Sequence, residues 1–415
     1  MPNKIVILII VLLFKTLLSV AQPKEKQAIL IAEINTILQS QIAQSKIPGA
    51  VILIKQGNKE IYKKAFGYAR LKAYDQQAIS NPEKTTVHHL YDIASLTKVI
   101  GTTTSIMLLV DRGLIKVDDP VAKYIKAFNT ADKKEITIRH LLTHTSGLYE
   151  WYPLYYFCKN KQESYQFIEA LPLNFPVGQG RHYSDLGFVL LGEIIETISG
   201  LSLEQFMQQN IFGPLKMKHT MFNPLKKGIG NKIAATSPGN PYERRMVTDS
   251  TLGFKVSTIV PNQWNGWRNY TLIGEVNDGI AWYANKGISG AAGLFSTIDD
   301  LQKLVDVLKN QGKDVSRQFI SENTIKLFLT KDKFNNGLGW MMDNDNAFMK
   351  NAVAGSFGHT GFTGTSIAVI PKYDISIILL INRQNIGLLK TREYYNLNPV
   401  REQVFNAVMK YCNQQ

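Results

Sequence analysis

Ser95 and Lys98 are the first residues whose types and spacing suggest chemistry, and they stand directly before an apolar stretch that runs to Val110. Residues three apart share a helix face, so the serine hydroxyl and the lysine amine can meet. A serine hydroxyl is a poor nucleophile until a base takes its proton, and a partly desolvated lysine can act as that base. A helix start also leaves N–H groups that can face a developing oxyanion. Alone, a Ser-x-x-Lys pattern is better explained by a capping serine and a surface lysine.

Tyr183 is a second candidate, because it precedes Ser184 and Asp185 at the start of a predicted helix from Gly187 to Ile198. A phenol has a pKa of about 10 in water, but neighbouring cations favour the phenolate, which can serve as a general base. Taken by itself, a tyrosine packed at a helix start explains this segment better.

A third candidate is the run Gly358-His359-Thr360-Gly361, which enters a predicted strand hairpin and is followed by Phe362. Its glycines would let the backbone approach a substrate closely. A charged His359 could bind a carboxylate, and the Phe362 N–H could donate to an oxyanion. A turn at a strand edge explains the run equally well.

Together, and in this order along the chain, the three candidates resemble the serine β-lactamase and penicillin-binding superfamily. The resemblance is closest to the branch that contains class C β-lactamases, D-Ala-D-Ala carboxypeptidases and related esterases. Several segments in the family's order are far more specific than any one motif. The segments that resemble the family are 93–98, 138–148, 190–195, 212–217 and 358–365.

The resemblance implies a role for each matching position. Ser95 is expected to be the acylated nucleophile, Lys98 its proton partner and Tyr183 the general base. The backbone N–H groups of Ser95 and Phe362 would form the oxyanion hole. Neither a metal nor a cofactor is implied. The residues expected to bind substrate are Asp185, His359, Thr360 and Gly361.

Two positions depart from the family's pattern. Asp185 stands where an asparagine is more usual, and its charge would keep Lys98 protonated, which shifts the base role toward Tyr183. His359 replaces the lysine of many β-lactamases and is largely neutral at pH 7, so its hold on a β-lactam carboxylate should be weaker. Segments 274–278 and 290–295 lack histidines that are familiar in a penicillin-binding subgroup. Efficient β-lactamase action is therefore the less favoured interpretation.

The pattern of apolar residues predicts an α+β fold with a sheet built from both termini and a mainly helical lobe inserted. The resemblance implies that this is the β-lactamase/transpeptidase-like fold, in which an antiparallel sheet is flanked by helices. We expect a single domain over 22–415, with an α/β part at 24–94 and 290–415, a helical lobe at 95–289, and an insertion or lid at 226–290. The predicted strands are 50–54, 61–68, 366–370 and 375–381. The predicted helices are 95–110, 138–142, 187–198, 203–209, 299–308 and a last helix capped by Asn398.

The N-terminus has the pattern of a secretory signal, with Lys4 before the apolar run Ile5–Phe14 and small residues up to Ala21. Residues 1–21 are therefore expected to be a signal peptide, which makes the protein periplasmic or secreted. An uncleaved anchor is the less favoured alternative. An oxidising compartment would permit a bridge between Cys158 and Cys412, but two distant cysteines do not imply one.

The formal net charge of +14 comes from scattered basic residues, which gives a nucleic-acid partner little support. Such a surface could associate peripherally with anionic cell-wall polymer or membrane lipid, although a soluble basic protein is the simpler interpretation. The oligomeric state is left open.

Other motifs carry less weight. His140 and His144 have the spacing of a zinc pair but lack the following glutamate, so structural packing is favoured. No Gly-x-Ser-x-Gly elbow is present, which disfavours an α/β-hydrolase. The aromatic residues of 149–157 could wall an acyl pocket or simply pack in the core. Trp264, Trp267 and Tyr270 could cap a cleft, although this is the less favoured interpretation.

The sequence therefore predicts an exported serine hydrolase that forms an acyl-enzyme on Ser95. We expect it to resemble a D-Ala-D-Ala carboxypeptidase or penicillin-binding protein and to act on cell-wall peptides or small esters. A class C-like β-lactamase and a promiscuous esterase are the enzymatic alternatives. A non-catalytic cell-wall binding or penicillin-sensing protein is the alternative of another class.

Overall fold

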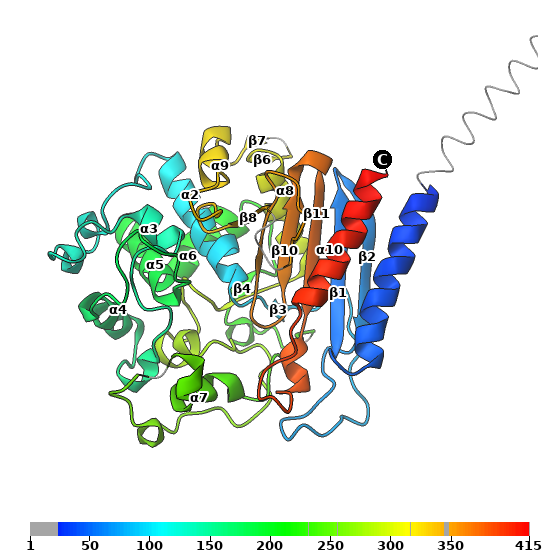
Figure 1. Cartoon of the computed structure of the whole chain (residues 1–415), viewed down its shortest axis with the longest axis horizontal. Helices are drawn as coiled ribbons and strands as arrows, with labels where there is room; N and C mark the ends of the chain where they lie inside the picture. Colours follow the sequence, from blue (N-terminus) through cyan, green and yellow to red (C-terminus); the bar gives the residue numbers. More distant parts are fainter. Residues whose placement is uncertain (1–23, 231, 255, 316, 344–347, 415) are drawn as a thin grey trace, which may run out of the picture.

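A six-stranded antiparallel sheet, built from both ends of the chain, forms the centre of the molecule (Figure 1). The computed structural model describes residues 24–230, 232–254, 256–315, 317–343 and 348–414, so the expected signal peptide, 1–21, lies outside the described residues. The sheet confirms the four predicted strands and the predicted fold class. Its strand order is β2 (Lys59–Gly67), β1 (Gly49–Gln56), β11 (Ile375–Ile381), β10 (Ser366–Ile370), β9 (Phe357–Thr360) and β8 (Met341–Met342).

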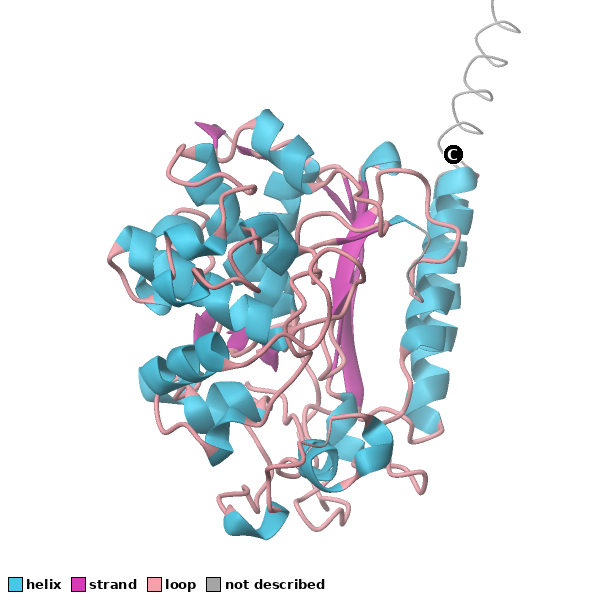
Figure 2. Cartoon of the chain, turned by 60° about the vertical axis from the view of Figure 1, so that its left-hand side comes forward, coloured by secondary structure: helices cyan, strands magenta, loops and turns pink. Residues whose placement is uncertain are grey.

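Strand β1 shows why a separate hydrophobic core lies on each face of the sheet. Its side chains alternate between the two faces, as they must in a pleated strand. Ile52 and Ile54 pack with residues of the helix at 24–43 and of α10 (Asn398–Asn413), whereas Val51 and Leu53 join the larger core beneath the helical lobe. Figure 2 shows the sheet edge-on with helices on both sides. Burying each such side chain contributes about 1.5–3 kcal/mol.

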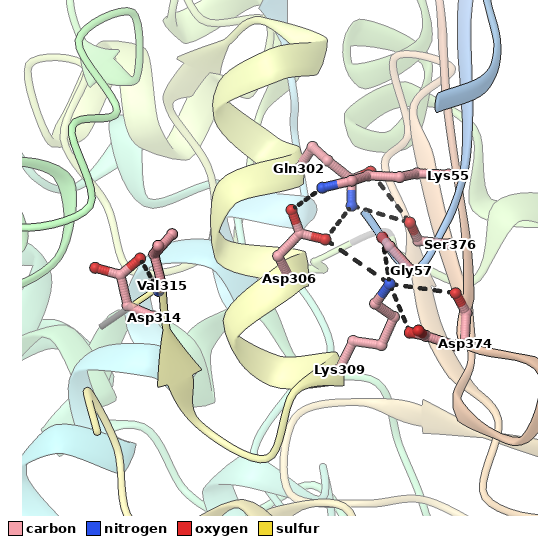
Figure 3. A network of polar contacts seen from close by, with 9 residues as sticks. All are labelled: Lys55, Gly57, Gln302, Asp306, Lys309, Asp314, Val315, Asp374 and Ser376. Carbon is pink, nitrogen blue, oxygen red and sulfur yellow. Dashed lines mark hydrogen bonds and ion pairs between the residues drawn. The ribbon is translucent and has the colours of Figure 1, made fainter. Parts of the chain in front are cut away.

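Helix α8 (Ile298–Lys309) is fastened to the sheet by polar contacts (Figure 3). Lys55 Nζ on β1 lies 2.6 Å from Asp306 Oδ2, and Lys309 Nζ lies 2.8 Å from Asp374 Oδ1 before β11. Gln302 on α8 also bonds Ser376 on β11, with 3.0 Å between Nε2 and Oγ. Because Lys309 is almost fully buried, its charge needs these partners.

The lobe between the two halves of the sheet is mainly helical, as the sequence predicts. Where the sequence predicts one helix over 95–110, a π-helical segment, Lys98–Thr103, precedes the α-helix. The last helix begins at Asn398, which is not its cap, so that prediction was wrong by one residue. Within the described ranges no single helix is long and apolar enough to cross a bilayer. The other α-helices are α2 (Thr104–Asp111), α3 (Ile138–Leu142), α4 (Lys161–Ala170), α5 (Asp185–Ser199), α6 (Leu203–Met207), α7 (Pro241–Thr248) and α9 (Glu322–Phe328).

A small three-stranded sheet connects the lobe to the segment that carries Ser95. Its order is β3 (Tyr91–Asp92), β5 (Leu294–Ser296) and β4 (Met221–Phe222). The sequence did not predict this sheet. A further two-stranded ribbon pairs β6 (Lys313–Asp314) with β7 (Arg317–Gln318).

Candidate active site

Ser95 lies in a tight turn that follows β3 and leads into the helical segment from Leu96. Ala94 has a φ of 46°, in the left-handed region that non-glycine residues rarely adopt. The Asp92 carboxylate holds the turn by accepting from Ala94 N at 2.9 Å and from Asn277 N at 2.6 Å. Burial raises the pKa of Asp92 to about 6, although both bonds oppose that change.

The late segment that follows β9 is tied directly to this turn. Thr363 Oγ1 donates to the Asp92 carbonyl at 2.7 Å, and Thr365 Oγ1 donates to the Ile93 carbonyl at 3.1 Å. A side chain at Gly361 would place its Cβ 2.5 Å from the Ile93 carbonyl oxygen, so glycine is required for this close approach. The structure thus brings the predicted third motif against the first.

Lys98 is buried beneath Ser95 and uses its ammonium in three contacts. Its Nζ donates to Ser95 Oγ at 3.0 Å and to the Ala291 carbonyl at 2.9 Å, and it forms a 2.7 Å ion pair with Asp185 Oδ1. Burial alone would lower the pKa of Lys98, but the charges of Asp185 and Tyr183 outweigh burial and raise it. Lys98 is therefore protonated at neutral pH, as the sequence predicts from the aspartate at position 185.

Tyr183 lies beside this ion pair. Its ring centroid is 5.1 Å from Lys98 Nζ, 5.7 Å from Arg181 Cζ and 4.3 Å from the centroid of the His144 ring. His144 Nδ1 accepts a hydrogen bond from Ser184 N at 2.9 Å. Burial, followed by the charges of Arg181 and Lys98, holds the pKa of His144 well below its usual value. This neutral imidazole supports the turn that carries Tyr183.

A cavity of about 270 Å³ opens between these elements. Four of the predicted site residues line it, and they are Ser95, Tyr183, Asp185 and Phe362. Phe362 is 42% exposed, and its carbonyl accepts two hydrogen bonds from the Arg383 guanidinium, at 2.6 and 3.1 Å. Among the contacts of the described residues, the N–H groups of Ser95 and Phe362 have no protein acceptor. Both amides therefore retain the capacity to bind an oxyanion.

His359 is not brought to the cavity. It is 1% exposed, its Nδ1 lies 2.8 Å from the Thr360 carbonyl oxygen, and burial together with the nearby Lys98 lowers its pKa to about 3. Thr360 and Gly361 are also not among the residues that line the cavity. A neutral, covered imidazole supplies no charge for a substrate carboxylate, so the geometry gives no support to that predicted contact.

Sequence patterns do not identify most of the remaining lining, which comes from 240–278, within the predicted insertion or lid at 226–290, and from Tyr394. These lining residues left only a weak signal in the sequence, a set of polar and aromatic residues without helical or strand periodicity. The lining residues of this stretch are Asn240, Tyr242, Glu243, Met246, Phe254, Asn277 and Asp278.

Trp264 and Trp267 do not cap this cavity. Their ring centroids lie 4.7 and 5.6 Å from that of Tyr155, in a separate aromatic cluster. Of the aromatic residues in 149–157, Trp151 is the one that lines the cavity.

Cys158 and Cys412 are both free and buried. Within the described ranges no group of three or more histidine, cysteine or acidic side chains could hold a metal ion.

A serine held against a buried lysine, beside a tyrosine and two unpaired amides, defines the site of a serine hydrolase. Residues 34–398 match the Beta-lactamase family, and the chain belongs to that family. It is a serine hydrolase of the β-lactamase superfamily.

Two relatives cover most of the chain. One is the “N-acetylmuramyl-L-alanine amidase” of Bacillus subtilis (strain 168), 30% identical over 88% of this chain and 83% of its own length. The other carries the name “Putative D-alanyl-D-alanine carboxypeptidase” in Escherichia coli (strain K12), and is 34% identical over 83% of this chain and 80% of its own length.

Solved structures agree on the fold. A class C β-lactamase from Rhodobacter sphaeroides superposes with a TM-score of 0.64 at 19% identity, covering 91% of this chain and 99% of its own. EstCE1, described as a hydrolase with promiscuous acyltransferase activity, gives a TM-score of 0.65 at 20% identity, with coverage of 91% and 99%.

Proposed function

We propose that this chain hydrolyses amides or esters through an acyl-enzyme on Ser95. The 3.0 Å contact between Lys98 Nζ and Ser95 Oγ, at the edge of a cavity that Tyr183 also lines, is the observation that carries the proposal. Protonated Lys98 orients the hydroxyl but has no lone pair to act as base. The base role therefore falls to Tyr183, whose ring centroid lies 5.1 Å from Lys98 Nζ and 5.7 Å from Arg181 Cζ.

In the first step the Ser95 oxygen bonds to the substrate carbonyl carbon while Tyr183 takes the serine proton. The N–H groups of Ser95 and Phe362 would bind the oxyanion. The bond to the leaving group then breaks, and the proton passes from Tyr183 to the departing amine or alkoxide. In the second step water bonds to the acyl carbon and gives a proton to Tyr183, and the bond from that carbon to Ser95 Oγ then breaks. Tyr183 returns the proton to the Ser95 oxygen as the acid is released.

The substrate we propose is a cell-wall peptide that ends in D-alanine, supported by the name of the Escherichia coli relative. A small ester is the second candidate. It is favoured because Trp151, Met246 and Phe254 give the cavity apolar walls and because His359 offers no charge to a carboxylate.

The decisive experiment exposes the protein to a fluorescent penicillin, to 4-nitrophenyl acetate and to a peptide ending in D-Ala-D-Ala, with intact mass followed over time. Release of D-alanine supports a peptidase, turnover of the acetate supports an esterase, and an adduct that never turns over supports a penicillin sensor. Ser95→Ala must remove every signal. Activity that survives in Ser95→Ala would overturn the proposal.

We also propose export through residues 1–21, on the sequence pattern alone. A protein recovered from the periplasm or medium should begin at Gln22. An intact Met1 on all of the protein would contradict cleavage.

A further inference from the structure

The Ser95 cavity is bordered by carboxyl groups that outnumber its cations. Asp185, Glu243 and Asp278 line it, whereas no lysine, arginine or histidine is among the described lining residues. Lys98 lies behind the wall and is paired with Asp185. The charges of Glu243 and Asp278 therefore have no cationic partner on the cavity wall.

Glu243 is the carboxyl group best placed to receive a ligand. It lies near the start of α7, and its Oε2 accepts a hydrogen bond from Gly279 N at 2.8 Å. Its Oε1 is buried and, apart from the neighbouring Tyr155 hydroxyl, has no hydrogen-bond donor within the described ranges. A Cβ at Gly279 would lie 2.1 Å from Glu243 Oε1, so the glycine keeps room for this carboxyl group. Buried polar atoms are normally satisfied, and an unsatisfied one in a cavity points to a missing partner.

The groups around Glu243 leave its charge uncompensated. Asp278 faces it, the Tyr155 hydroxyl is an uncharged donor beside it, and Arg268 is the nearby cation. The Arg268 guanidinium is already shared, with Nε 3.2 Å from Asn240 Oδ1 and Nη1 3.5 Å from the Glu275 carboxylate. Burial, followed by the charge of Asp278, raises the pKa of Glu243 to about 8. Below about pH 8 the Glu243 carboxyl group therefore carries a proton instead of pairing with a cation.

We propose that the cavity selects acyl groups that carry an alkylammonium group, with Glu243 as the counter-ion. Trp151, Met246 and Phe254, on the same cavity wall, suit the carbon chain that joins the ammonium to the carbonyl. A peptide with a free lysine-type side chain has this chemistry. The inference rests on the hydrolysis proposed above and specifies its substrate class.

The test compares three 4-nitrophenyl esters of matched length: 6-aminohexanoate, heptanoate and the monoester of heptanedioate. We expect kcat/KM to be roughly tenfold or more higher for the aminated ester than for heptanoate, with the anionic ester slowest. Glu243→Gln should bring the ratio of the first two close to one. Glu393→Gln is the matched control, because Glu393 pairs with Arg245 on the same helix but does not line the cavity, and the ratio should persist there.

A second readout needs no variant. An alkylamine stays protonated up to about pH 10, whereas Glu243 becomes a carboxylate as pH rises through about 8. The ratio of kcat/KM for the aminated ester over heptanoate should therefore rise between pH 7 and pH 9 in the unaltered protein. The titration of the catalytic groups affects both esters equally, so it cancels in this ratio of kcat/KM values.

A ratio at or below one, or a ratio that is flat with pH and equal in folded Glu243→Gln, would overturn the inference. That outcome is distinct from a failure of the proposed function. If heptanoate is hydrolysed and Ser95→Ala abolishes the hydrolysis, the function stands and only the ammonium preference falls. If none of the three esters is hydrolysed and Ser95 is not acylated, the proposed function itself is wrong.

Discussion

At the scale of single residues, the site depends on the three contacts of Lys98. The ammonium joins the Ser95 hydroxyl, the Ala291 carbonyl and the Asp185 carboxylate. Because burial of an unpaired charge is unfavourable, the position of Lys98 and the identity of residue 185 are coupled. The aspartate fixes the lysine as a proton-bearing group rather than a free base.

Replacing Lys98 with methionine should separate catalysis from stability. We expect Lys98→Met to lower the rate of Ser95 acylation by about 10²–10⁴, because the hydroxyl loses its oriented partner. It should also reduce the free energy of unfolding by about 2 kcal/mol, because Asp185 loses its counter-ion. Urea unfolding and acylation rates measure the two effects.

The double variant Lys98→Met with Asp185→Asn supplies the control. It should recover most of the lost stability without recovering acylation, since the unpaired carboxylate is gone but the ammonium is still absent. Acylation at the native rate in either variant would show that Lys98 is not part of the chemistry.

Residue-level chemistry was only partly predictable. The sequence motifs placed Ser95, Lys98, Tyr183 and Asp185 together, and the structure brings these four to one place. Glu243 carried no motif, because its importance arises from burial beside Asp278, which is 35 positions away in the chain. The burial of His359 could not be predicted either, because a motif gives a residue's type but not its exposure.

At the scale of elements, the segment after β9 is positioned by two arginines. Arg383 donates to the Phe362 carbonyl, and Arg401 on α10 donates to the carbonyls of Gly361 and Thr365 at 3.3 and 3.0 Å. These contacts fix the peptide planes of the turn and hence the direction of the Phe362 N–H. The C-terminal helix thus supports the site without reaching the cavity.

Loss of the Arg383 contact should therefore impair chemistry more than binding. We expect Arg383→Gln to lower kcat by roughly 10- to 100-fold with a smaller change in KM, because an oxyanion donor acts mainly in the transition state. Arg383→Lys should recover part of the loss by contacting the same carbonyl. Equal changes in kcat and KM for all esters, or an unchanged kcat, would rule out this positioning role.

The long elements were predictable and the short ones were not. Strands 50–54 and 375–381 are largely continuous apolar runs, and the predicted helices 187–198 and 299–308 are long enough to show a helical period. Strands β3, β4 and β5 contain two or three residues each, so no period can appear. The cavity wall at 240–278 is held by tertiary contacts such as the one from Asn277 N to Asp92, which local sequence does not encode.

At the scale of the whole molecule, the site forms where distant segments meet between the sheet and the helical lobe. His359 lies on β9 within this junction, and it is buried in the neutral form. Protonating it places a charge in the core, near Lys98. Stability of the fold should therefore depend on the neutral form of this imidazole, as it should on that of His144.

The sign of the effect follows from the lowered pKa. The unfolded histidine takes up a proton near pH 6.5 and the folded one only near pH 3, so stability is complete above pH 6.5 and declines as pH falls from there. We expect His359 to account for a loss of about 2 kcal/mol between pH 7.5 and pH 5. Urea unfolding at both pH values should show a shallower loss in His359→Gln, whereas the exposed control His219→Gln should behave like the unaltered protein.

The most direct measurement is the mass and position of the covalent adduct formed with a penicillin or a 4-nitrophenyl ester. After rapid quenching and proteolysis, we expect a single acyl group on the peptide that contains Ser95, with no adduct in Ser95→Ala. An acyl group on any other residue, or unchanged turnover without acylation of Ser95, would contradict the central claim that this serine is the nucleophile.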